Sequence, residues 1–104
     1  METIRIKPGV EFDPRTVGDP RFWVMAEAAQ ETAPAGYSIT ITSGCEGRHR
    51  VDSQHYEGEA IDIRIRDFPK KLGVWESRIQ KRLGDTYYVL LEPTHLHIQR
   101  KKRS

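Results

Sequence analysis

Alternation of polar and apolar residues along the chain predicts short β-strands, because a period of two places every second side chain on one face of a sheet. In one such segment the isoleucines at positions 61, 63 and 65 share a face that we expect to be buried, which leaves Asp62 on the opposite face. The predicted strands are residues 3–7, 37–42, 59–65, 86–91 and 95–99, of which 86–91 is almost wholly apolar.

A period of three to four residues predicts two helices between these strands. The first is expected to begin where Asp19 supplies a capping carboxylate and Pro20 occupies the first helical position, and to end before Pro34. The second is expected to begin at Pro69 and to end at Gly84. Their apolar faces consist of Phe22, Met25, Ala26 and Ala29 in the first helix, and Leu72, Trp75, Ile79 and Leu83 in the second.

The resulting order is strand, helix, strand, strand, helix, strand, strand. It predicts the α+β class, with a small, mostly antiparallel sheet and two helices packed on one side of it. A chain of 104 residues is expected to form a single domain, residues 1–104. The polar stretch Ser43–Gln54 is predicted to be a long loop, and loops of that length are often functional.

Composition excludes several classes of protein. The formal net charge is only +2, with much of the excess in residues 100–104, which we expect to form a basic frayed tail. Cys45 is the only cysteine, so an internal disulfide is impossible. No apolar run approaches transmembrane length, and residues 1–7 lack the apolar core of a signal peptide. We therefore expect a monomer made as a soluble cytoplasmic chain, with neither nucleic acid nor a membrane as its partner.

The candidate chemistry lies in two stretches that together contain three histidines and a carboxylate. His55 precedes Asp62 by seven residues, and His95 and His97, two residues apart on a predicted strand, share one face. Two imidazoles and a carboxylate suit a zinc ion with one open position, where the pKa of bound water falls toward ~7. Glu92 is a candidate for the carboxylate that accepts the proton of this water. On spacing alone, ordinary surface or core histidines explain the pattern equally well.

Both stretches also carry a known motif. Ser53 to Asp62 matches Ser-x-His-x-x-Gly-x-Ala-x-Asp at every fixed position, and His95-Leu96-His97 matches the His-x-His that follows it. In these motifs the chain resembles the LAS group of zinc metallopeptidases over residues 42–99. That group includes D-alanyl-D-alanine carboxypeptidases and dipeptidases, phage L-alanyl-D-glutamate endolysins and the N-terminal domain of hedgehog. The resemblance implies a hedgehog- or D,D-peptidase-like fold.

The resemblance also implies roles for individual residues. His55, Asp62 and His97 would bind one zinc ion per chain, and His95 would act beside it on the transition state. Several family members carry the catalytic carboxylate three residues before the ligand histidine, where this chain has Thr94. Glu92 lies five residues before His97, and hedgehog-like sequences also place a glutamate further upstream. Alternatively His95 is the ligand, because Glu92 lies three residues before it.

The function implied is that of a zinc-dependent peptidase that hydrolyses D,D- or L,D-type amide bonds in peptidoglycan stem peptides. Arg48, Arg50 and Ser53 would bind the substrate, since arginine suits recognition of carboxylates. Solvated loop arginines explain Arg48 and Arg50 equally well, and for Ser53 a structural role in capping a turn, with some substrate contact, is favoured. The enzyme would be phage-encoded and would act on the cell wall after release or as part of a virion. The alternative is a zinc-stabilised binding module of the same fold with weak or no catalysis.

Overall fold

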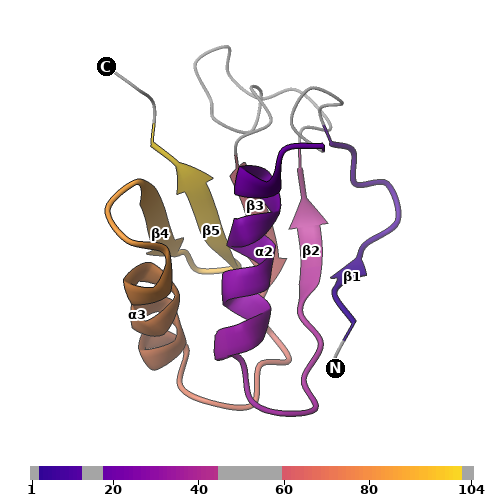
Figure 1. The fold of residues 1–104 in the computed structure, drawn as a ribbon. Helices are drawn as coiled ribbons and strands as arrows, with labels where there is room; N and C mark the ends of the chain where they lie inside the picture. Colours follow the sequence, from indigo (N-terminus) through magenta and orange to yellow (C-terminus); the bar gives the residue numbers. More distant parts are fainter. Residues whose placement is uncertain (1–2, 13–17, 45–59, 102–104) are drawn as a thin grey trace.

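The computed structural model describes residues 3–12, 18–44 and 60–101. They form a five-stranded sheet with two helices on one of its faces (Figure 1), which confirms the predicted α+β class and the predicted order of elements. The sheet order is β1-β2-β3-β5-β4, with β1 parallel to β2 and every other pair antiparallel. The elements are β1 (Arg5–Ile6), α2 (Pro20–Thr32), β2 (Thr40–Ser43), β3 (Ala60–Arg64), α3 (Leu72–Leu83), β4 (Tyr87–Leu91) and β5 (His95–Arg100).

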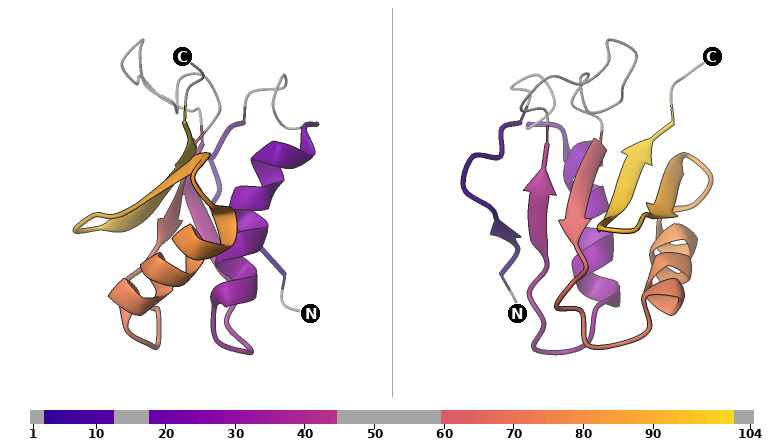
Figure 2. Two further views of the ribbon diagram at one scale, coloured as in Figure 1. Left: turned by 60° about the vertical axis from the view of Figure 1, so that its left-hand side comes forward. Right: turned by 180° about the vertical axis from the view of Figure 1, so that it is seen from behind.

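The core lies between the sheet and the helices (Figure 2). The helices contact each other, α3 packs on β4, and α2 packs on β3 and β5. As predicted, Ile61, Ile63 and Ile65 of the β3 segment are buried, and Leu96 and Ile98 of β5 are completely so. The side chains that alternate with them therefore lie on the sheet face that the helices leave uncovered. Neither helix in the described part of the chain is long and apolar enough to span a membrane.

The first helix begins as the sequence predicts. The Asp19 carboxylate accepts the backbone N–H of Arg21 at 2.9 Å and pairs with its guanidinium at 2.8 Å. These contacts with Arg21 lower the pKa of Asp19 to about 2.

The prediction for the second helix was wrong at its start, because α3 begins at Leu72 rather than at Pro69. Phe68 donates its N–H to Ile65 O at 3.0 Å, so the chain is still turning there. At the other end Gly84 stops the helix, with a φ of +83°.

The last strand is longer than expected. Arg100 belongs to β5 and lies opposite Tyr87, and Lys101 donates its N–H to Thr86 O at 2.8 Å. The first two residues of the predicted frayed tail are therefore held by the β4–β5 ladder, and residues 102–104 lie outside the described part. The reason is that Tyr87, the first residue of β4, pairs with Arg100, and Thr86, directly before β4, accepts the hydrogen bond from Lys101.

Each helix holds the strand segment that follows it through one glutamine. In α2, Gln30 donates its Nε2 to Tyr37 O at 2.6 Å and accepts the N–H of Ile39 on Oε1 at 2.9 Å. In α3, Gln80 donates to Tyr87 O at 2.9 Å and accepts the N–H of Val89 at 3.1 Å. We call these two arrangements the glutamine clamps. In both clamps the glutamine precedes its acceptor by seven residues and its donor by nine. The sequence alone did not reveal this repeat, because the residues around the two glutamines differ.

The clamp at Gln30 predicts a stability effect. Ile39 is completely buried, so Gln30→Ala leaves its N–H without this acceptor and should lower the free energy of unfolding by about 2 kcal/mol. Urea denaturation followed by circular dichroism measures the change. Glu27→Ala, an exposed position on the same helix, is the matched control and should leave stability nearly unaltered. Equal effects of the two substitutions would contradict the role of the clamp.

Candidate metal centre

The pairing of β3 with β5 brings the predicted chemical residues together. Asp62 lies directly opposite His97 in the ladder, and Arg64 lies opposite His95. Because directly opposed residues project to the same face, Asp62 meets both histidines on the face that the helices leave uncovered. This confirms the prediction that the two histidines share a face, with Leu96 between them in the core.

His97 is the more enclosed of the two histidines, with 13% of its side chain exposed. Its Nδ1 lies 2.9 Å from Asp62 Oδ1, and its Nε2 lies 2.5 Å from Gln99 Oε1. Burial lowers the pKa of His97, but the hydrogen bonds to Asp62 and Gln99 and the charges of Asp62 and Glu92 outweigh it, so that the pKa is raised above its ordinary value. The contact with Asp62 therefore favours the protonated form of His97.

His95 stands between two carboxylates. Its Nε2 lies 3.6 Å from Asp62 Oδ1 and 3.4 Å from Glu92 Oε1, while its Nδ1 lies 3.0 Å from the hydroxyl of Thr94. Glu92 donates its backbone N–H to His95 O at 2.9 Å, which fixes the turn that carries both residues. Glu92 therefore lies beside His95.

The described residues fit zinc in their chemistry. Imidazole nitrogens and a carboxylate oxygen are its usual ligands, and atoms that share a tetrahedral zinc ion lie roughly 3.3 Å apart. The contacts of Asp62 Oδ1 at 2.9 Å with His97 and 3.6 Å with His95 lie close to that separation. Among residues 3–12, 18–44 and 60–101, however, no group of three His, Cys, Asp or Glu side chains is placed to hold a metal ion. His55, the remaining predicted ligand, lies outside the described residues, as do Arg48, Arg50 and Ser53.

A cavity of about 280 Å³ opens beside these residues. Asp62 and His95 form one wall, and the cationic side chains that line the rest come from Lys7, Arg64 and Arg66. The alternation that places Asp62 on the face opposite the isoleucines also places Arg64 there, but the sequence did not point to Lys7 or Arg66. The alternation of β3 could have indicated Arg66, two residues beyond Arg64, whereas Lys7 joins the cavity only through the order of strands in the sheet. Gln99 was also missed, although it lies two residues after His97 and so on the same face.

The contact between Asp62 and His97 predicts a titration. In the metal-free protein, NMR should give His97 a pKa above 6.5, and Asp62→Asn should lower it; Asp67→Asn, which removes a carboxylate outside the site, should not. Because the folded-state pKa is raised, the pair stabilises the metal-free fold fully below pH ~6.5, and this contribution is lost as the pH rises through the folded-state value. An unshifted His97 in the wild type would contradict the described geometry.

Comparison of the chain with models of protein families found no match, and comparison with curated proteins found none either. The functional assignment therefore depends on the motif residues and on the geometry of Asp62, Glu92, His95 and His97.

Proposed function

We propose that the protein is a zinc-dependent peptidase that hydrolyses amide bonds in peptidoglycan stem peptides. The observation that carries the proposal is the meeting of Asp62 with both histidines of the His-x-His motif on the uncovered face of the sheet, with Glu92 beside them. A structural role alone would not require two imidazoles and two carboxylates in contact at one place. The matching motif that ends at Asp62 supports the same function.

In this proposal His55, Asp62 and His97 would hold the metal, which would lower the pKa of a water molecule and polarise the scissile carbonyl. Glu92 would act as the general base that takes a proton from the attacking water and returns it to the leaving amine. His95 donates a hydrogen bond from Nε2 to the oxygen that becomes negative in the transition state. Thr94 orients the His95 ring from its other side, through Nδ1.

Two observations favour His97 over His95 as the ligand. His97 is closer to Asp62, at 2.9 Å rather than 3.6 Å, and its side chain is less exposed, at 13% rather than 28%. His95 instead faces Glu92, where a group that acts on the transition state is needed. Glu92 is itself 38% exposed, as expected of a residue that exchanges a proton with water or product.

The cationic cavity indicates how a substrate is oriented. Lys7, Arg64 and Arg66 bring three positive charges to a space next to Asp62 and His95. Stem peptides carry free carboxylates, and arginine binds a carboxylate through paired hydrogen bonds. A cavity of about 280 Å³ suits one terminal residue with its carboxylate rather than an extended chain. We therefore favour cleavage next to the carboxyl end of the stem peptide, as in D,D- or L,D-carboxypeptidases, with Arg48, Arg50 and Ser53 binding the rest of the substrate.

A second candidate function is a zinc-stabilised binding module without catalysis. It is favoured by the position of Glu92, five residues before His97, since several family members carry the carboxylate where this chain has Thr94. In either case we infer action on the cell wall, reached after release or as part of a virion, and a phage origin fits both.

Substitution of Glu92 separates the two functions. Glu92→Gln should retain about one zinc per chain and lose roughly 10²–10⁴-fold in hydrolysis of a stem pentapeptide that ends in two D-alanines. Mass spectrometry of protein without a histidine tag measures the zinc, and His97→Ala is the control that should lose it. Zinc in the wild type without turnover would favour the binding module, and full activity in Glu92→Gln would remove Glu92 from the mechanism.

Substitution in the cavity tests the orientation of the substrate. Arg66→Gln should raise KM about tenfold for a peptide with a free C-terminal carboxylate and leave kcat nearly unaltered, because a charge-assisted hydrogen bond is lost. With the C-terminal amide of the same peptide, variant and wild type should be equal. Arg5→Gln, at an exposed position that does not line the cavity, is the matched control. A similar rise in KM with both peptides would show that Arg66 does not bind the C-terminal carboxylate.

A further inference from the structure

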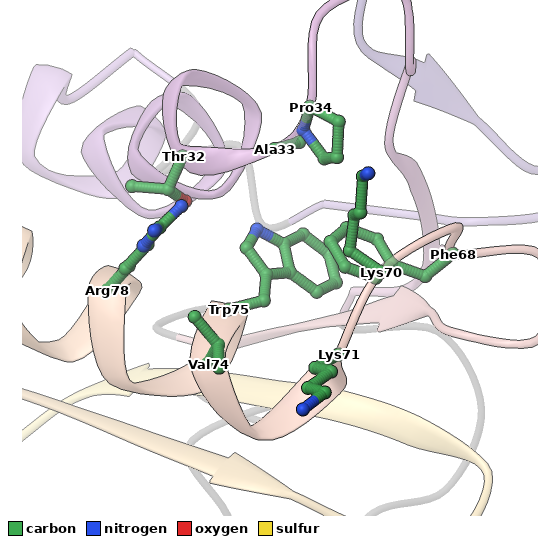
Figure 3. Close-up of a pocket in the computed structure, with 9 residues that line it drawn as sticks. All are labelled: Thr32, Ala33, Pro34, Phe68, Lys70, Lys71, Val74, Trp75 and Arg78. Carbon is green, nitrogen blue, oxygen red and sulfur yellow. The ribbon is translucent and has the colours of Figure 1, made fainter.

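A second cavity lies on the other side of the sheet, between the end of α2 and the start of α3, and has a volume of about 430 Å³ (Figure 3). It shares no lining residue with the cavity at Asp62. Its apolar lining residues, which we call the floor, include Pro34, Phe68, Val74 and Trp75. Nothing in the proposed peptidase mechanism uses this cavity, so it requires its own explanation.

The two aromatic rings of the floor are already engaged with other rings. Trp75 stacks on Phe68 with 4.0 Å between ring centroids and an interplanar angle of 13°, and Tyr37 meets Phe68 edge-on at 5.2 Å. The indole N–H of Trp75 is donated to Ala29 O at 3.1 Å, and only 2% of this residue is exposed. Val74, in contrast, is 46% exposed. The floor therefore offers aliphatic surface and ring edges to a ligand.

The rim of the cavity is cationic. Lys70 rises past the rings toward Pro34 and Arg78 reaches Thr32, so that the two cations stand on either side of Trp75, while Lys71 points away from the indole (Figure 3). Among the described residues, no carboxylate lines the cavity. Within the described part of the chain, none of the three cations forms an ion pair. Unpaired cations around an exposed apolar residue are complementary to an anionic ligand with an apolar group.

The cationic surface continues along α3. An adjoining groove shares Arg78 with the cavity and adds Lys81. Arg82 and Glu31 also line this groove, but they are paired with each other, so their charges offset. A ligand that extends from the cavity along this groove would therefore meet further positive charge, which favours several negative charges in sequence over a single anion.

We propose that this cavity binds an acidic peptide segment of a partner protein, with one apolar side chain as its anchor. The anchor contacts Val74, Pro34 and the ring edges, and carboxylates on either side of it pair with Lys70 and Arg78. Single-stranded nucleic acid is disfavoured, because base stacking needs an exposed ring face, whereas only 2% of Trp75 is exposed and Phe68 is already stacked on it. A membrane surface is disfavoured, because among the described residues that line the cavity Val74 is the one large apolar side chain that is strongly exposed, which offers little apolar surface to insert into lipid. The proposal does not depend on zinc or on hydrolysis.

The test uses the full chain and a capped, fluorescent probe peptide of sequence Glu-Glu-Phe-Glu-Glu, with binding followed by fluorescence anisotropy. This probe should bind at least tenfold more tightly than two control peptides. Gln-Gln-Phe-Gln-Gln lacks the charges, and Glu-Glu-Gly-Glu-Glu lacks the apolar anchor. In NMR spectra the probe should shift the signals of Val74 and of the Trp75 indole N–H, and not those of Asp62. If the glycine probe binds as tightly as the phenylalanine probe, binding is unspecific attraction between charges and the proposal is overturned. The absence of binding at millimolar probe would also overturn it.

Substitutions place the binding in the cavity. Lys70→Glu combined with Arg78→Glu should weaken the probe at least tenfold, and Val74→Asp should do the same; all three positions are exposed, so the fold should survive, which circular dichroism checks. Arg5→Glu makes the same kind of charge change elsewhere and should leave affinity unchanged. Two further probes are an oligothymidine and vesicles with phosphatidylglycerol. If either binds more tightly than the peptide and loses this binding in the double variant, the cavity is instead a site for nucleic acid or for lipid, respectively.

Discussion

The pairing of β3 with β5 is the constraint on which the rest of the structure depends. Ile61, Ile63, Leu96 and Ile98 are at most 1% exposed, so these two strands supply the centre of the core. Because side chains alternate along a strand, a shift of one residue in the register of either strand would expose its apolar side chains to water and disrupt the core. The hydrophobic effect therefore fixes the register, and the register in turn places Asp62 opposite His97. The geometry of the candidate centre is a consequence of burial on the other face of the same strands.

This dependence explains what the sequence could predict and what it could not. Alternation revealed the strands and their faces, and the capping residues Asp19 and Gly84 marked a helix start and a helix end, because these signals are local. The start of α3 was missed because the turn at Phe68 is stabilised by stacking on Trp75, a tertiary contact. The length of β5 was underestimated because its last residues are held by β4.

The candidate site shows the same division. The alternation of side chains along each strand was sufficient to bring Asp62, His95 and His97 to one face. Lys7, in contrast, comes from a strand whose place in the sheet no local pattern reveals. Lys7 reaches the cavity only because β1 pairs in parallel with β2. The cationic cavity at Trp75 depends on the packing of α2 against α3. In the sequence, the α3 residues that line it show only the pattern of an ordinary amphipathic helix. Contacts that join distant segments are thus what the structure adds.

The clamp at Gln80 has a consequence beyond the packing of one helix. β4 lies at an edge of the sheet, where unpaired N–H and C=O groups would otherwise be a template for a strand from another molecule. Gln80 binds Tyr87 O and Val89 N, and Glu76 accepts the N–H of Leu91 at 2.7 Å, so side chains of α3 take the place of a sixth strand. Tyr88 and Leu90, both exposed, would favour such an addition if that edge were open. Helix α3 therefore protects the protein against aggregation through its sheet, and two polar residues on a helix determine where the sheet ends.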